Sequence, residues 1–517
     1  MMGDAVPQPP WDFPLWARLA HFSLAKFSAL RKIKLLARRI GQSRDGTRAP
    51  SQVRTGGGPK RRLPVTPGHH LRTPVFLSNR WGPPHTYLPE QELLLPPSLR
   101  EWLPENHLVY FVSDVVDQLD LSAIHAKYEK EKRGQPPYDP SLMTKLLVYG
   151  YCTGVFSSRR IQKRLQEDIP FKVLAAGNEP DFRTISDLRK IHIETLQNLF
   201  EQVLAMALEC GAVQLGRVSL DGTKLKANAS KHKAMSYGRM KAKQQQLQEE
   251  VKQWLEQAEA ADQDEDRQYG GQRGDQLPEE LRRRETRLAK IKQAKKIVEQ
   301  RARDQAAEEG QSAEEAKRAK PEDKDPYNFT DPESRIMKGA DGFVQGYNAQ
   351  AAVEPTLLLI VGQSVTEAAN DKQQLKPMVE LIEQQSGQRP EAILADNGYC
   401  SEENLEHLES VDQPERKIEG FLATGKQKHG EHGLPAKRGP LPKGATKVDR
   451  MKQKLRTKAG KAIYAGRKCV VEPVFGQIKQ ARGFRQFLLR GKEKVKGEWA
   501  LLCLTHNVLR LYAAMQY

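Results

Sequence analysis

The stretch Arg217-Val218-Ser219-Leu220-Asp221-Gly222-Thr223-Lys224-Leu225-Lys226-Ala227 decides how the fold is interpreted. Its first half predicts a short strand that ends in a carboxylate, Asp221, and the strand can continue from Lys224 to Ala227. Further strands are predicted at 342–353, 357–365, 391–395 and 420–424, with a helix opened by Asn370-Asp371 between the second and third of these. The predicted fold class is therefore α/β, with a mixed sheet flanked by helices.

Two helical regions precede and interrupt this sheet. Residues 90–212 predict an all-helical N-terminal domain, with helix starts at Asp139-Pro140, Ser157-Ser158 and Pro180-Asp181. Its short helices and tight turns are compatible with a helix-turn-helix DNA-binding module, or with helices whose basic faces are only solvated. Residues 234–320 predict a helical hairpin inserted into a sheet domain of 213–515, because two stripes of heptad-spaced apolar residues flank a polar stretch. The first stripe is Leu247, Val251, Trp254 and Ala258, and the second is Leu281, Leu288, Ile291 and Val298.

The 517-residue chain is basic, with 83 Lys and Arg against 65 Asp and Glu and a formal net charge of +18. The excess lies in two stretches, since residues 1–72 hold 14 basic and 3 acidic residues and residues 426–468 hold 14 and 2. Such concentrated positive charge favours nucleic acid as a partner. An acidic membrane surface and ordinary surface solubility are the alternatives.

Composition argues against several classes of protein. The mean hydropathy is −0.68, and no apolar run approaches the roughly 18 residues that cross a bilayer. The five cysteines form no CxxC pair, so neither a zinc cage nor a disulfide framework is indicated, and a reduced cytoplasmic protein is expected. Residues 1–75 lack the order of a secretion signal and predict a basic, disordered extension, either a binding arm or a dispensable segment.

Three acidic residues occupy positions where catalytic side chains gather in α/β proteins. Asp221 ends the first predicted strand, Asp396 ends a central strand before a turn, and Glu472 opens a C-terminal helix with Pro473 in its first turn. If the two strands are neighbours, Asp221 and Asp396 converge. Grouped carboxylates repel one another unless divalent cations neutralise them, and a pair of Mg2+ ions suits phosphodiester cleavage and strand transfer. Helix capping or simple exposure is the alternative explanation.

Three blocks of sequence resemble those of insertion-sequence transposases of the IS1182 type, within the IS4/IS5-like group of DDE transposases. Residues 219–228 (SLDGTKLKAN) are similar to the first catalytic block of that family, 394–399 (LADNGY) to the second and 471–479 (VEPVFGQIK) to the third. The likeness extends from about Leu93 to Tyr512 and includes FVQGYNAQ at 343–350. Three blocks in this order are far more specific than any one of them.

The resemblance implies an RNase H-like core, DNA cleavage at the terminal inverted repeats of the element, and strand transfer into target DNA. It implies Asp221, Asp396 and Glu472 as the catalytic and metal-binding residues, with two Mg2+ ions or Mn2+ in their place. Double-stranded DNA is the expected partner, a homodimer on DNA the expected assembly, and the bacterial nucleoid the expected location, with no membrane.

Six residues near these blocks are predicted to contact DNA. The wider group carries the signature Tyr, two residues, Arg, three residues, Glu, six residues, Lys. Tyr464 and Arg467 have the right mutual gap, as have Glu472 and Lys479, but four residues separate Arg467 from Glu472. Either Arg467 or Lys468 therefore takes the Arg role. Lys479 lies at i+7 from Glu472 on one helical face, and the first block adds Lys224 and Lys226.

Two other functions remain open at this point. One is a DNA-binding protein that has kept the fold without the activity, as in a decayed or repurposed element. The other is an RNase H-like nuclease that cleaves without strand transfer. The presence of all three acids favours an active transposase over the first, and the predicted hairpin and basic stretch favour it over the second, because both could grip transposon ends.

Overall fold

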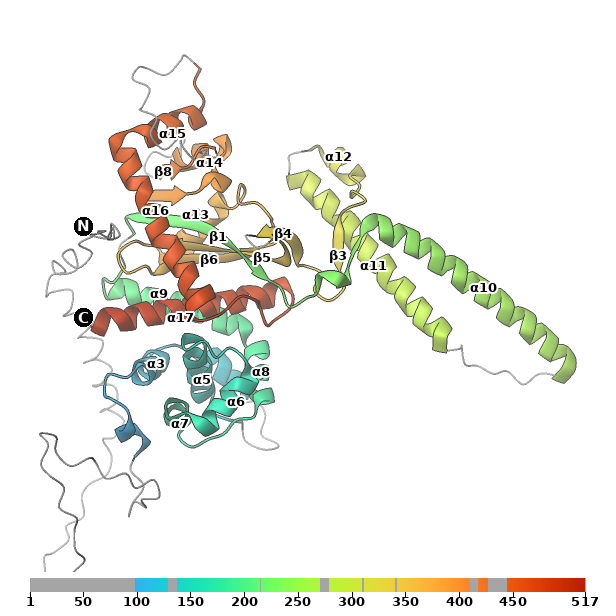
Figure 1. Cartoon of the computed structure of the whole chain (residues 1–517), viewed down its shortest axis with the longest axis horizontal. Coiled ribbons are helices and arrows are strands. Elements are labelled where there is room, and N and C mark those ends of the chain that lie inside the picture. Colours follow the sequence, from blue (N-terminus) through green and yellow to red (C-terminus); the bar gives the residue numbers. More distant parts are fainter. Residues whose placement is uncertain are drawn as a thin grey trace, which may run out of the picture.

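The sheet is built around β1 (Arg217–Lys226). β1 pairs antiparallel with β5 (Gly342–Val353) on one side and parallel with β7 (Ala392–Ala395) on the other, and β8 (Glu419–Leu422) continues parallel beside β7. β4 (Arg335–Gly339) and β6 (Ile360–Thr366) both pair antiparallel with β5, along different parts of its length. The result is a six-stranded mixed sheet, shown in Figure 1.

The computed structural model describes residues 98–128, 137–213, 215–269, 279–308, 311–339, 342–409, 417–425 and 444–516. The predicted extension over residues 1–75 lies outside these ranges, as does much of the predicted basic stretch, at 426–443. Among the described helices, none is long and apolar enough to cross a membrane.

The predicted strands agree with β5, β7 and β8 to within about two residues, and β6 begins at Ile360. β1 does not stop at Asp221 but continues, in agreement with the predicted continuation from Lys224, because its next five residues keep pairing with β5 as far as the pair Lys226–Gly346. Asn370-Asp371 precedes the helix α13 (Leu375–Ser386) by a turn rather than opening it. β4 and the small hairpin of β2 (Ala234–Ser236) and β3 (Pro326–Asn328) were not predicted.

The N-terminal part of the described chain is helical. Its elements are η1 (Leu99–Trp102), α3 (Leu108–Asp117), α4 (Ser122–Tyr128), α5 (Pro140–Cys152), α6 (Ser158–Glu167), α7 (Ile169–Ala175), α8 (Phe182–Ile191) and α9 (Ile193–Glu209). Asp139 caps α5 by accepting from the N–H groups of Ser141 and Leu142, which confirms the predicted start there. Asp181 caps α8 in the same way, whereas the Ser157 side chain makes no capping hydrogen bond.

The C-terminal region is helical, as predicted, but broken. α15 (Lys447–Arg456) is followed by α16 (Lys458–Gly476), the π-turn η5 (Gln477–Ala481) and α17 (Lys492–Gln516). Between η5 and α17 the chain runs beside the end of β1, where Phe487 N–H donates to the Lys226 carbonyl. α17 packs against α9, α5 and β6, so it lies between the sheet and the N-terminal helices (Figure 1).

A buried polar group fastens the N-terminal helices to α17. The Glu498 carboxylate accepts from the Tyr151 hydroxyl at 3.0 Å and from the Leu488 and Leu489 N–H groups, and Arg189 Nη1 donates to the Tyr151 oxygen at 3.0 Å. Burial raises the pKa of Glu498, and Arg189 opposes that rise. Because buried polar groups are costly unless they are paired, this network holds the helical region in one orientation against the sheet.

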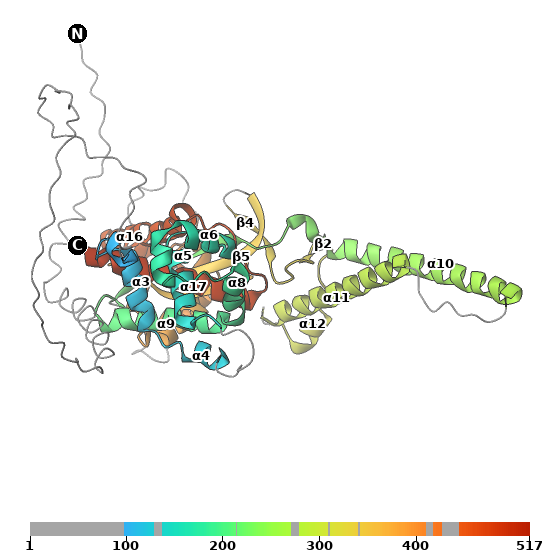
Figure 2. The same ribbon diagram turned by 90° about the horizontal axis from the view of Figure 1, so that it is seen from below.

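Two long helices, α10 (Tyr237–Tyr269) and α11 (Glu279–Glu308), project away from the body as an antiparallel pair, with α12 (Ala313–Arg318) at their base (Figures 1 and 2). They share a small apolar core that includes Leu247, Leu288, Ile291 and Val298. These are four of the residues in the predicted heptad stripes. The stripe positions Trp254 and Ala258 have side chains outside the described part.

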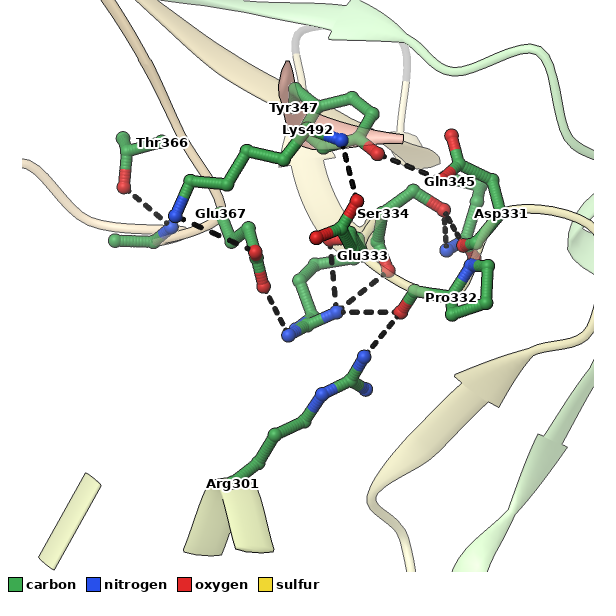
Figure 3. A network of polar contacts seen from close by, with 12 residues as sticks. Arg301, Asp331, Pro332, Glu333, Ser334, Gln345, Tyr347, Thr366, Glu367 and Lys492 are labelled. Carbon is green, nitrogen blue, oxygen red and sulfur yellow. Dashed lines mark hydrogen bonds and ion pairs between the residues drawn. The ribbon is translucent and has the colours of Figure 1, made fainter. Parts of the chain in front are cut away.

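The base of this helix pair is bound to the sheet by the network in Figure 3. Arg301 of α11 donates to the Pro332 carbonyl, and Arg335 of β4 donates to the same oxygen at 3.0 Å. Arg335 also pairs with Glu367, which follows β6, and Glu367 lies 3.6 Å from the Lys492 ammonium of α17. Arg301 therefore joins the helix pair to a segment that Arg335, Glu367 and Lys492 link to the rest of the body.

Candidate active site

Asp221 and Asp396 lie side by side on neighbouring parallel strands. The register pairs Ser219 of β1 with Leu394 of β7, and each aspartate stands two residues beyond that pair. Asp396 follows β7 directly and caps the turn η3 (Asn397–Tyr399), where its Oδ1 accepts from Gly398 N–H at 2.8 Å. The condition for convergence, that the two strands be neighbours, is thus met.

Asp221 is held by one backbone and one side-chain partner. Its Oδ1 accepts from Gly222 N–H at 2.8 Å, and its Oδ2 forms an ion pair with Arg467 Nη1 at 3.0 Å. Burial raises the pKa of Asp221, Arg467 opposes the rise, and the charge of Asp396 adds to it. Burial is the largest cause of this rise, so the charged form of Asp221 is costly at this position.

Arg467 of α16 points into this acidic group. Its residue exposure is 7 %, and its guanidinium carbon lies 6.0 Å from the centre of the Tyr464 ring, one turn earlier on the helix. Burial raises the pKa of Tyr464. The adjacent Lys468 is exposed. The two candidates for the signature arginine therefore occupy different places: Arg467 is beside Asp221 and Lys468 faces solvent.

Glu472 does not open a helix, which corrects the prediction. It lies well inside α16, and Pro473 is an interior residue of that helix. Both residues are exposed. Proline has no N–H to donate to the preceding turn of the helix, and water can donate that hydrogen bond instead. The Glu472 carboxylate forms no hydrogen bond or ion pair with the described residues. Nor do those residues contain a group of three or more His, Cys, Asp or Glu arranged to hold a metal ion.

The predicted DNA-contacting lysines differ in their exposure. Lys226 is exposed at the end of β1, and Lys479 is partly exposed. Lys479 lies in η5, so a π-turn separates it from Glu472 and the argument from one α-helical face does not hold. Lys224 is mostly buried, with its ammonium 3.8 Å from Asp371 Oδ1. A position inside the protein was not expected for a phosphate contact.

Asp371 is an acidic residue of this region that the sequence reasoning missed. Its Oδ1 accepts from Asn348 Nδ2 at 2.6 Å and from Gln350 Nε2 at 2.7 Å, both on β5. The Tyr399 hydroxyl donates to the other end of the Gln350 amide. The only sequence signal was Asn370-Asp371, which was interpreted as a helix start.

The part of the predicted basic stretch that the structure describes lies on α15 and on α16, the helix that carries Arg467. Lys447 and Lys454 pair with glutamates of the body. The exposed basic residues of α15 and α16 are Arg450, Lys452, Lys458, Lys461 and Lys468. An exposed row of cations beside a pair of aspartates suits a polyanionic substrate.

The donor atoms of Asp221 and Asp396 fit a divalent ion. Carboxylate oxygens are the ligands that Mg2+ prefers, and Asp221 and Asp396 bring two carboxylates to matching positions of adjacent strands. Glu472 is not part of this group in the structure. Two of the three predicted ligands are thus brought together, and the third is not.

Comparison with known families gives two matches. Residues 97–190 match the family described as Transposase domain (DUF772), and residues 313–508 match the Transposase DDE domain. Together the matches cover more than half of the chain. The first spans most of the N-terminal helices, the second includes Asp396 and Glu472, and Asp221 lies between them. No curated protein and no solved structure matches the chain.

Proposed function

We propose a specific reaction for this chain, which belongs to the DDE transposases: it cuts DNA at the terminal inverted repeats of its own element and joins the freed ends to target DNA. The observation that carries the proposal is the pairing of Asp221 and Asp396 on adjacent strands, in a family that uses divalent metal ions. IS1182 is the type of insertion sequence that the two matched domains favour.

We infer that the sheet is an RNase H-like core. What supports this is the strand order β6-β5-β1-β7-β8, in which three antiparallel strands are followed by two parallel ones, with the aspartates on the two central parallel strands. On this proposal the region 213–515 is the catalytic domain, 234–320 is its insertion and 90–212 is a helical domain for DNA binding.

In the proposed mechanism Asp221 and Asp396 hold Mg2+, or Mn2+ in its place, and Glu472 contributes the third carboxylate when DNA is bound. A pair of bound ions would activate a water or a DNA 3′-hydroxyl and stabilise the leaving oxygen. Arg467 orients the Asp221 carboxylate through its 3.0 Å contact and favours the ionised form against the effect of burial. Because Glu472 is exposed and on the same helix as Arg467, a change at α16 on DNA binding could bring it to the aspartates.

Double-stranded DNA is proposed to lie along α15 and α16, where the exposed lysines would contact its phosphates. The outer surface of α11 is a second candidate contact, since Arg282, Arg287, Lys290, Lys292 and Lys296 are exposed there. Its anchoring through Arg301 would let the projecting helices hold DNA in a fixed orientation to the sheet. A homodimer on DNA is proposed because two ends must be joined together.

The test uses Asp221→Asn and Asp396→Asn with a plasmid that carries the terminal repeats of the element. Each variant should lose cleavage and still retard end DNA in a gel, because a neutral amide keeps the shape of the side chain and loses the charge that holds a metal ion. The matched control is Glu380→Gln, an exposed acid on α13, which should cut normally. Full activity in either aspartate variant would remove the site assignment.

The same assay separates the alternatives. A wild-type protein that binds the ends in Mg2+ and Mn2+ without cutting them would be the decayed or repurposed DNA-binding protein. Cutting without joined products would identify a nuclease. Joined products that depend on Asp221 and Asp396 are the outcome expected for a transposase.

A further inference from the structure

Lys224, like Arg467, is a predicted DNA contact that the structure buries among acids. Its side chain is 17 % exposed, and its ammonium has no hydrogen-bond partner among the described residues. The closest charged atom is Asp371 Oδ1 at 3.8 Å. Burial lowers the pKa of Lys224. The charges of Asp371, Asp396 and Asp221 oppose this, with decreasing effect in that order. A buried ammonium facing three aspartates is placed to offset their charge.

Asp371 fixes this arrangement by lying between the two catalytic blocks. A Cβ on Gly222, the residue after Asp221, would lie 2.7 Å from Asp371 Oδ1, and a Cβ on Gly398 would lie 3.3 Å from Asp371 Oδ2. The Gln350 and Asn348 amides crowd the same point, so glycine at position 222 leaves room for Asp371 and the two amides that hold it. Asp371 thus touches the chain just beyond each catalytic aspartate.

The β1–β5 register explains why Lys224 and Asp371 meet. Lys224 is directly opposite Asn348, and Gly222 is directly opposite Gln350. Opposed residues of an antiparallel pair share a face, so the two amides that hold Asp371 stand next to Lys224. The contact is set by the sheet and is not a chance approach of two flexible side chains.

We propose that Lys224 is a positioning residue of the active site: it is the internal cation that holds Asp371 and offsets the charge of the catalytic aspartates while no divalent ion is bound. This inference rests on the proposed function, because it takes Asp221 and Asp396 to be the metal ligands. Three carboxylates and two cations, Lys224 and Arg467, then face one another, with a net charge of −1.

This balance predicts opposite effects for two substitutions. Lys224→Met leaves a net charge of −2, so a divalent ion should bind about tenfold or more tightly. Asp371→Asn leaves a net charge of 0, so the ion should bind about tenfold or more weakly. Both variants should melt at a lower temperature than wild type without metal. A purely structural role would instead weaken ion binding in both.

The experiment measures Ca2+ affinity by calorimetry and the Ca2+-induced rise in melting temperature, because both are read without turnover. Lys224→Arg keeps the charge and should bind Ca2+ as wild type does. Lys226→Met removes an exposed charge from the same strand and should change the affinity by less than about threefold. If Lys224→Met cannot be obtained folded, Lys224→Gln, which removes the charge and keeps a polar side chain, takes its place: tighter Ca2+ binding than wild type supports the proposal, and unchanged or weaker binding overturns it.

Other outcomes would also overturn the proposal. Equal Ca2+ affinity in wild type and Lys224→Met, with a loss of DNA affinity and a shallower salt dependence, would make Lys224 a phosphate contact. A change of the same sign in both variants would make the pair a packing feature. Asp221→Asn that binds Ca2+ as tightly as wild type would refute the metal site itself, and with it both this inference and the proposed function.

Discussion

Removal of Arg467 should destabilise the protein in a pH-dependent way. The pair joins Nη1 and Oδ2 at 3.0 Å, and the side chains of Arg467 and Asp221 are 9 % and 20 % exposed. Loss of one partner of a buried pair costs about 3–5 kcal/mol, and the partial exposure of Asp221 reduces this to about 2–3 kcal/mol. For Arg467→Met we therefore expect the melting temperature of the catalytic region to fall by about 5–10 °C near neutral pH.

The sign of the pH dependence follows from Asp221. Its pKa is already raised by burial, and loss of Arg467 raises it further. When the pKa of a carboxyl is higher in the folded than in the unfolded state, its contribution to stability is fully present below the unfolded pKa of about 3.9. That contribution is lost as the pH rises through the pKa of the folded state. The deficit of the variant should therefore be smaller at about pH 5 than at about pH 8.

Scanning calorimetry at the two pH values measures this difference. Lys468→Met is the matched control, because it removes an exposed charge from the adjacent position of the same helix and should leave the melting temperature within about 2 °C at both pH values. Adding Asp221→Asn to Arg467→Met should restore part of the loss. An equal deficit at both pH values would refute the view that Arg467 acts by neutralising Asp221.

Three further outcomes are expected. Glu472→Gln should reduce cleavage by more than the roughly 10–100-fold that follows loss of a residue that only supports a metal ligand. Its melting temperature should be unchanged because the side chain is exposed, and a melting temperature several degrees lower would show that Glu472 has a structural partner. Replacing Lys458, Lys461 and Lys468 together by Ala should weaken binding to end DNA and lower the slope of log affinity against log salt by about 2–3, and an unchanged slope would place the DNA elsewhere. Deleting residues 1–72 should leave cleavage intact, so its loss would identify the extension as a functional arm.

The sequence predicted much of the sheet because strand signals are local. The apolar run before Asp396 and the turn dipeptide after it mark the end of β7 wherever that strand lies. The cap at Asp139 likewise depends only on the next few N–H groups. By contrast, the end of β1 depends on whether Gly222 to Lys226 have a partner strand, and β5 provides one. Local residue type left that continuation open.

The candidate catalytic acids also show what the sequence determines and what only the tertiary structure determines. The three blocks alone identified Asp221, Asp396 and Glu472 as the acids to consider, and the parallel pairing of β1 with β7 brought the first two together. Only the tertiary structure showed that Arg467 pairs with Asp221, that Lys224 is buried beside Asp371, and that Glu472 is exposed inside α16. Residue identity and spacing set which groups the chain has and where each element begins or ends. Which charge faces which depends on strand register and helix packing between segments far apart in the chain, because electrostatic interactions act through space and not along the sequence.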